Sequence, residues 1–397
     1  MFEALTARPP DAIMALMEMC KADTNPNKID LGVGVYKTGD GATPIMRAVK
    51  TAEQLWWNEE ETKTYVSTTG NADFRAHMLS LILGDDIIAS RRDRIASSQA
   101  AGGSGALRMG ADILYAANPD ATVWVSTPTW ANHIPLISSA GFELKKYPYY
   151  DRETMGVDFD AMMSCLKNNT KAGDIVVLHG CCHNPTGADL SDAQWDQVAD
   201  LLAEKQIMPF IDLAYFGLGR GLVDDTYGLR RIIDTSPEMI FAASCSKNFA
   251  LYRERVGLVA MICKDTDTAK IAQSQLGSIQ RRMISMPPDH GAALVARILG
   301  DDDLKKIWSD ELTEMRLRIN SLREQLSDAL NVQGGEVIAA AIKNQIGMFS
   351  MLPLSEAQAI RLREEFSVYV TNSGRMNMAG TSNQNIPRLA ESILAVL

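Results

Sequence analysis

A single lysine stands where an apolar run ends, and its neighbours suggest chemistry. Residues 239–243 are typical of a buried strand; Ser244, Ser246 and Lys247 follow it directly, and Arg255 comes eight residues after the lysine. A lysine amine with little solvent around it has a lowered pKa and becomes a nucleophile toward aldehydes. Two hydroxyls and an arginine can together hold a phosphate. Taken alone, the stretch also fits a surface lysine in a polar loop.

A carboxylate lies inside another apolar run, residues 210–217. Ionised Asp212 is costly there unless a cation or a strong donor meets it, and Tyr215 offers a phenol near the same strand end. A compound with an aldehyde, a phosphate and a protonated ring nitrogen would suit both Lys247 and Asp212, and pyridoxal 5′-phosphate has all three. The alternative is that Asp212 caps the next helix.

The stretch AGGSGALRMG, residues 101–110, opens a helical pattern with glycines and a serine. Backbone N–H groups and the positive end of the helix dipole could face an anion there, most naturally a phosphate. The stretch lacks the spacing of a P-loop or of a dinucleotide-binding turn. It also fits a flexible helix start without a ligand.

The stretch HGCCHNPTG, residues 179–187, places polar side chains at the end of a predicted strand. Asn184 and Thr186 could face a ligand, or they could only satisfy the backbone of the turn. His179 and His183 are four residues apart, but a metal pair at that spacing requires a helix. We therefore predict no zinc site.

Short apolar runs alternate with helical patterns through the middle of the chain. This rhythm predicts an α/β fold with a largely parallel sheet that helices cover on both faces. Strands are expected at 122–126, 142–147, 174–179, 208–213, 239–243 and 256–263, with helices such as 105–117 and 192–204 between them. Ligands bind such sheets at the carboxyl ends of the strands. Lys247, Asp212 and Asn184 end or follow strands, so we expect them to share one crevice.

The pattern changes after about residue 300. A charged amphipathic helix is expected over 310–331, strands at 347–352 and 368–370, and a helix over 355–366. These elements indicate a smaller α+β unit, which we expect the residues before about 45 to complete.

The composition argues against several classes of protein. The 397 residues are 46% hydrophobic and 22% charged, as in a globular protein with a large core. A net charge of −10 argues against nucleic acid as a partner, because phosphate binding needs a basic face. No signal-peptide pattern and no membrane-spanning apolar stretch is found, so we predict a cytoplasmic protein with no membrane partner. Six cysteines without zinc spacing predict reduced thiols and no structural metal.

The motifs occur in one order along the whole chain: LGVGVYK from residue 31, SGALR from 104, HNPTG from 183, DLAY from 212, SCSKNF from 244, RERVG from 253 and SGRMNMAG from 373. In this set the sequence resembles the aspartate and aromatic aminotransferase family, which belongs to the fold-type I pyridoxal-phosphate enzymes. The resemblance implies a large cofactor-binding domain over 46–300 and a smaller α+β domain formed by 1–45 and 301–397. It also implies an obligate homodimer with shared active sites.

The same resemblance assigns roles around the cofactor ring. Lys247 would be the Schiff-base lysine and the acid and base that moves the proton. Asp212, backed by His133, would pair with the ring nitrogen, and Tyr215 and Asn184 would hydrogen-bond the ring hydroxyl oxygen.

The resemblance implies further cofactor contacts and a substrate clamp. Arg375 would bind the substrate α-carboxylate as a planar fork, and Arg281 of a second subunit would bind a side-chain carboxylate. Two alternatives stay open: Arg282 could be the inward residue of the arginine pair, and Trp130 could be plain core. Trp130 would otherwise stack on the ring, Gly34 would lie beside the substrate, and the phosphate would contact Gly103, Ser104, Ser244, Ser246, Arg255 and Tyr65 of the second subunit.

The substrate is predicted from a few differences within the resemblance. Ser104 takes the form of the aromatic-type enzymes, whereas residues 35, 37 and 43 look like the aspartate type. Ile284 and Met286 replace a tyrosine and a short polar residue, which makes the surroundings of Arg281 more apolar and adaptable. We predict an aminotransferase for aromatic amino acids that also accepts dicarboxylates and uses 2-oxoglutarate. The alternatives are an aspartate-specific enzyme, another reaction on the same cofactor, and a cofactor-binding sensor without turnover.

Overall fold

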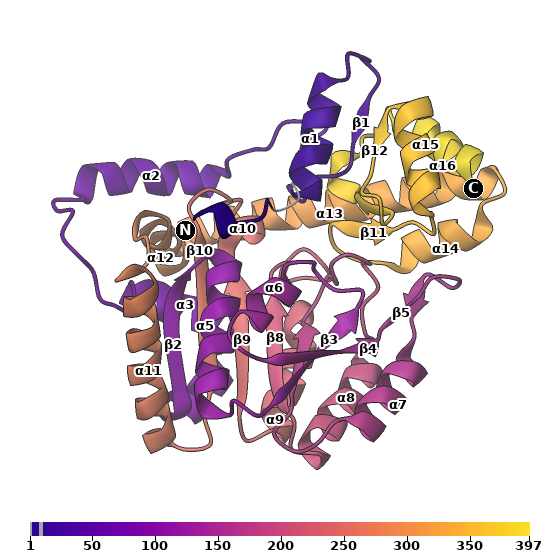
Figure 1. Ribbon diagram of the computed structural model, residues 1–397. Coiled ribbons are helices and arrows are strands. Elements are labelled where there is room, and N and C mark those ends of the chain that lie inside the picture. The colour runs from indigo at the N-terminus through magenta and orange to yellow at the C-terminus, as the bar shows by residue number, and fades with distance from the viewer. Residues whose placement is uncertain (1, 8–10) are drawn as a thin grey trace.

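The computed structural model describes residues 2–7 and 11–397. A central sheet forms the body of the molecule, and the C-terminal helices lie together with helix α1 above one end of it (Figure 1). No helix in the described part of the chain combines the length and the apolar character that crossing a membrane requires.

The central sheet has seven strands in the order β2-β10-β9-β8-β7-β3-β4. Strands β9, β8, β7, β3 and β4 run parallel, and β10 is antiparallel to both β9 and β2. The predicted α/β class with a mostly parallel sheet is therefore confirmed. The strands are β2 (Ile95–Ala101), β3 (Thr122–Thr127), β4 (Glu143–Pro148), β7 (Ile175–His179), β8 (Met208–Leu213), β9 (Met239–Ser244) and β10 (Val256–Ile262).

Helices bury an apolar cluster against each face of this sheet. Capping fixes where several of them begin: the Ser191 and Gln194 side chains form a reciprocal capping box at the start of α8. One face packs against α5 (Gly102–Ala117), α6 (His133–Ser138) and α11 (Thr266–Ile284), and the other against α3 (Ala72–Leu83), α7 (Phe159–Asn169), α8 (Asp192–Glu204), α9 (Tyr227–Thr235) and α12 (His290–Gly300). Shorter elements are α4 (Asp85–Arg91), η2 (Arg92–Arg94), β5 (Tyr150–Asp151), β6 (Gly156–Val157), η3 (Asp224–Thr226) and α10 (Cys245–Asn248).

The N-terminal segment joins the C-terminal elements through short strand pairs. Strand β1 (Ile29–Asp30) pairs with β12 (Val368–Tyr369), and β11 (Phe349–Met351) pairs with β13 (Arg375–Asn377). This part also contains η1 (Phe2–Ala4), α1 (Ala12–Ala22), α13 (Asp302–Val332), α14 (Glu336–Asn344), α15 (Glu356–Phe366), η4 (Met378–Gly380) and α16 (Ile386–Val396). Helix α2 (Arg47–Glu59) packs against both α12 and α13. The division into domains at residues 45 and 300 stays a prediction.

The structure differs from the sequence-based prediction in where one helix begins and in two strands that were not predicted. The helix expected from residue 310 begins at Asp302, where the Asp301 carboxylate accepts two backbone N–H bonds. Strand β2 was not predicted, because IASSQAA has a single β-branched residue and little of the composition that favours strands. The three-residue strand β13 was also missed, because it is too short to show a period.

Candidate active site

A cavity of about 240 Å³ lies at the carboxyl ends of the parallel strands. Eleven of the residues predicted for the site line it: Gly34, Gly103, Ser104, Trp130, Asn184, Asp212, Tyr215, Ser244, Ser246, Lys247 and Arg255. Leu107, His179, Ala214 and Tyr252 complete the lining and were not predicted. The expectation that Lys247, Asp212 and Asn184 share one crevice is met by the geometry.

Lys247 lies on the single turn α10, which follows β9 directly. Burial lowers the pKa of its amine to about 8; nearby Asp212 opposes this shift and Arg255 adds to it. The amine lies 4.6 Å from the centre of the Tyr215 ring and has no hydrogen-bond partner among the described residues. A neutral, unpaired amine is a nucleophile, so this lysine can react with an aldehyde in the cavity.

Asp212 is the last but one residue of β8 and is 5% exposed. His133 Nε2 donates to its Oδ2 at 3.1 Å, and the Thr129 hydroxyl bridges His133 Nδ1 and His179 Nε2 at 2.8 and 3.0 Å. Burial opposes ionisation of Asp212, but the hydrogen bond from His133 and the attraction of nearby groups such as Lys247 outweigh it, so the pKa is lowered. The carboxylate therefore stays ionised and can hold a protonated ring nitrogen.

A cradle for an anion forms where α5 begins. Arg255 Nη1 donates to Ser246 Oγ at 3.4 Å, and Ser246 N donates to Ser244 Oγ at 3.2 Å. Gly102 has a φ of +72°, and a Cβ there would lie 2.4 Å from Arg255 Nη2. Only glycine leaves room for the guanidinium to approach the helix N-terminus, and the two together attract a phosphate.

Arg375 is almost fully buried beside the cavity, at 6% exposure. Its Nη2 donates to Gly32 O at 2.8 Å, its Nη1 to Asn184 Oδ1 at 3.5 Å, and the guanidinium lies 4.5 Å from the centre of the Phe349 ring. No carboxylate pairs with it among the described residues, and its Nε is buried without a partner. A buried arginine with a free donor is suited to bind the carboxylate of a ligand.

Tyr65 and Arg281 do not line the cavity of their own chain. Tyr65 is 88% exposed, and Arg281 is exposed near the end of α11. The loop that contains Tyr65 lies against the segment just after α11, because Val66 N donates to Met286 Sδ at 3.2 Å. Arg282 is exposed as well, so its alternative role stays open.

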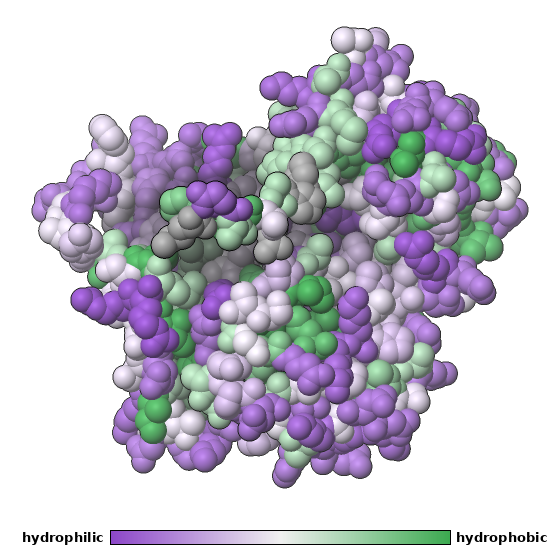
Figure 2. Space-filling model, viewed as in Figure 1, coloured by the Kyte–Doolittle hydropathy of each residue, from purple (hydrophilic) through white to green (hydrophobic). Residues whose placement is uncertain are grey.

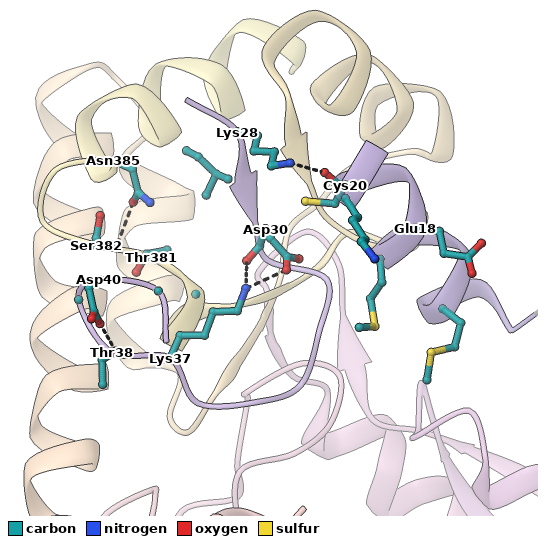
Figure 3. A pocket seen from close by; sticks show the side chains of 17 residues that line it. Glu18, Cys20, Lys28, Asp30, Lys37, Thr38, Asp40, Thr381, Ser382 and Asn385 are labelled. Atoms are coloured by element: carbon teal, nitrogen blue, oxygen red, sulfur yellow. Dashed lines mark hydrogen bonds and ion pairs between the residues drawn. The ribbon is translucent and has the colours of Figure 1, made fainter. Parts of the chain in front are cut away.

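A second cavity, of about 660 Å³, lies between α1 and the loops at 37–41 and 380–385 (Figure 3). Two of its three lysines are paired: Lys37 Nζ lies 2.8 Å from Asp30 Oδ2, and Lys28 Nζ donates to the carbonyls of Cys20 and Asp23. The third, Lys21, is exposed. Exposed methionines of α1 border it, and Figure 2 shows α1 as a pale green band on the surface.

One buried group brings metal-ligand atoms within 4.8 Å of one another, namely Cys181, Cys182 and Asp225. Sequence spacing did not find it, because Asp225 is distant in the chain. The Asp225 oxygens accept bonds from the backbone N–H groups of Gly217, Gly219 and Arg220. The pKa of Cys182 is raised to about 11, so its thiol stays protonated. The contacts are those of a hydrogen-bonded cluster, and the absence of a metal stays a prediction.

The fold and the cavity define the class of enzymes that attach an aldehyde cofactor to a lysine at the edge of an α/β sheet. Comparison with known proteins gives the family, because residues 26–393 match the profile of "Aminotransferase class I and II". The chain belongs to this family.

Similar proteins cover its whole length. An aspartate aminotransferase of Escherichia coli is 44% identical over 100% of both chains. An aromatic-amino-acid aminotransferase of Paracoccus denitrificans is 43% identical over 99% of this chain and 98% of its own. The crystal structure of an aromatic-amino-acid aminotransferase from Burkholderia pseudomallei, covalently bound to pyridoxal phosphate, has a TM-score of 0.96 and 43% identity, and covers 100% of this chain and 99% of its own.

These findings confirm the predicted family, activity and cofactor. The protein is an aminotransferase, and its cofactor is pyridoxal 5′-phosphate. The residues of the cavity fit this compound, because a nucleophilic lysine, an ionised carboxylate and an anion cradle face one space of suitable size. The sensor without turnover is not favoured.

Proposed function

We propose that Lys247, Asp212 and Arg375 carry the transamination. The observation that supports this most is the meeting of an amine with a pKa of about 8 and an ionised, buried carboxylate in one cavity. Perturbed pKa values of two groups in a shared cavity are typical of catalytic groups.

Each residue has a separate task in the proposed mechanism. When bound, the cofactor supplies a protonated ring that withdraws electrons from the α-carbon of the substrate. Asp212 keeps that ring nitrogen protonated, and His133 holds the Asp212 carboxylate in place. Lys247 Nζ accepts the proton from the substrate α-carbon, and Arg375 orients the α-carboxylate so that this proton points at the amine.

Tyr215 and Asn184 complete the polar wall of the cavity. Burial raises the pKa of the Tyr215 phenol, which therefore remains a hydrogen-bond donor. We assign both residues to the ring hydroxyl oxygen, and Trp130 to the face of the ring. Gly103, Ser104, Ser244, Ser246 and Arg255 would hold the phosphate, as their positions around the start of α5 support.

A homodimer with shared sites would explain the two predicted residues that are far from the cavity. Tyr65 lies in a loop that contacts the segment just after α11, Arg281 lies in the last turn of α11, and both side chains are exposed. In the proposed dimer these two segments of one subunit complete the cavity of the other. Lys247→Ala and Arg281→Ala subunits, each poorly active alone on aspartate, should then regain up to about a quarter of wild-type activity when they are refolded together, because one hybrid site is intact. Failure to regain activity would contradict site sharing.

The substrates are proposed to be aromatic amino acids and dicarboxylates, with 2-oxoglutarate as acceptor. Support comes from Ser104 in the cavity and from Ile284, which is 45% exposed beside Arg281. Relatives named for aromatic and for aspartate activity are similarly close, at 43 and 44% identity. An aspartate-specific enzyme is the second candidate, supported by Val35, Lys37 and Thr43.

Side-by-side measurement of kcat/KM for aspartate, phenylalanine and tyrosine with 2-oxoglutarate separates the two candidates. Values of kcat/KM within about tenfold of one another for the three donors fit the enzyme that accepts both aromatic and dicarboxylate substrates. A single methylene or ring contact changes the ratio of kcat/KM between two substrates by about that factor. A preference for aspartate above about 10³-fold would establish the specific one.

We also propose the predicted domain boundaries, at residues 45 and 300, and a cytoplasmic location. The pairing of β1 with β12 supports an N-terminal segment that belongs with residues 301–397. All six cysteines are free thiols, as is usual in the cytoplasm.

A further inference from the structure

An irregular segment, residues 32–36, borders the cofactor cavity, and we call it the roof. Gly34 lines the cavity, and a Cβ at Gly34 would lie 3.0 Å from Phe349 Cζ and 3.9 Å from the Tyr215 hydroxyl. The roof has no helix or strand of its own, so its backbone depends on other partners for its hydrogen bonds.

Side chains of β13 hold most of the roof. Arg375 Nη2 donates to Gly32 O at 2.8 Å, and Asn377 Nδ2 donates to Val33 O and Val35 O at 2.6 and 2.7 Å. At its base, Lys37 reaches back to the Asp30 carboxylate (Figure 3). All these partners lie in the N-terminal segment or after residue 300.

Only one side chain from the sheet-bearing part bonds the roof backbone, among the residues that the structure describes. Tyr36 N donates to the hydroxyl oxygen of Tyr252 at 2.9 Å. Tyr252 lies between Lys247 and Arg255, and its own carbonyl accepts a bond from Arg255 Nη1 at 3.1 Å. Tyr252 therefore connects the anion cradle, through its carbonyl, to the roof, through its hydroxyl.

We propose that Tyr252 is a positioning residue that fixes the roof over the cavity through Tyr36 and so sets how tightly amino acid and oxo acid substrates bind. The proposal rests on the role of Arg375 as the carboxylate clamp, because the roof carbonyl of Gly32 holds the Arg375 guanidinium. Burial raises the pKa of Tyr252 to about 12, so the phenol stays neutral over the working range and remains an acceptor for Tyr36 N–H.

Tyr252→Phe tests this by removing one oxygen atom. The buried N–H of Tyr36 then has no partner, and the roof must move to satisfy it. We expect KM for every amino acid and oxo acid to rise about tenfold while kcat stays within about threefold, because Lys247 and Asp212 are untouched. The matched control is Tyr147→Phe, which removes a hydroxyl that donates to Val177 O at 2.8 Å within the sheet. It should leave both constants unchanged.

A second readout does not depend on activity. In the holoenzyme, amide exchange of the peptide that contains residues 31–37 should accelerate in Tyr252→Phe and stay unchanged in Tyr147→Phe. Faster exchange without a change in KM would preserve the bond to the roof but overturn its part in substrate binding, and would point to a failure of the Arg375 assignment.

Two other results would overturn the proposal itself. If exchange of the roof is unchanged, the Tyr252 hydroxyl does not position it. If the variant instead shifts the pH at which the cofactor absorbance titrates, with KM unchanged, the hydroxyl acts on the cofactor.

Discussion

The two cavities of this protein differ in size and, more importantly, in how their charges are satisfied. In the larger, of about 660 Å³, Lys28 and Lys37 already have partners, and the third lysine, Lys21, is exposed to solvent. The smaller, of about 240 Å³, contains Lys247 without a hydrogen-bond partner and borders Arg375, whose buried Nε has none.

The comparison teaches that a buried charge without a partner, more than volume, identifies a site of chemistry. Leaving a buried donor unpaired costs free energy, so a fold retains such groups where a ligand will meet them. In the larger cavity a ligand could pair with Lys28 or Lys37 only by displacing existing bonds, such as those from Lys28 to two backbone carbonyls.

The largest contrast is expected between lysines of the two cavities. Lys247→Ala should lower kcat by about 10³-fold or more, because positioned proton transfer alone contributes roughly 10² to 10⁴ and the covalent bond to the cofactor is lost as well. Lys28→Ala should change kcat/KM less than about twofold, because its partners are backbone carbonyls far from the reacting atoms. Steady-state kinetics on both variants check this, and a Lys247→Ala enzyme within tenfold of wild type would refute the assignment.

Replacing a carboxylate should also lower kcat more in the smaller cavity than in the larger one, but the difference should be smaller than for the lysines. Asp212→Asn should lower kcat by about 10²-fold or more, since an amide cannot hold the ring nitrogen protonated. Glu18→Gln, in the larger cavity, should leave kcat within about twofold. Reconstitution of Asp212→Asn with an N-methylated cofactor, whose ring carries a permanent charge, should restore part of the loss. No restoration would mean that Asp212 acts in another way.

The smallest effect concerns pH. Since burial lowers the pKa of Lys247 to about 8, its reactive neutral form is populated above that pH. Covalent capture of pyridoxal phosphate by the apoprotein should therefore speed up about fivefold from pH 7 to 8 and level off above pH 9. In Asp212→Asn the plateau should begin at lower pH, because the anion that raises this pKa is gone. Stopped-flow absorbance measures the rate, and a steady rise to pH 10 would indicate an ordinary lysine.

Much of the cavity was predictable because several of its residues are charged or polar where the surrounding sequence is apolar. Lys247 and Asp212 are charged residues in or beside apolar strands, and the order of strands places both at one edge. His179 was considered only as a metal ligand, although it lines the cavity and bonds Thr129. Thr129 itself carries no signal in the sequence, since threonines are common in turns.

The contact of Tyr252 with the roof could not be predicted. Its partner is a backbone N–H 216 residues away, and backbone groups leave no trace in side-chain patterns. A tyrosine next to the RERVG motif gives at most a hint that a phenol lies near the cavity.

The place of β2 at the edge of the sheet constrains how the chain can be made. Within the sheet β2 pairs only with β10, so residues 95–101 cannot form their strand pairing until residues 256–262 have been synthesised. A ribosome must therefore produce about two thirds of the chain before the strand that leads into α5 finds its neighbour, and such distant pairing is slow. Until then the segment is an unpaired edge, open to chaperones or to aggregation. A nascent chain stalled before residue 256 would carry Arg255 and both serines of the anion cradle but lack β10, the strand that joins β2 to β9.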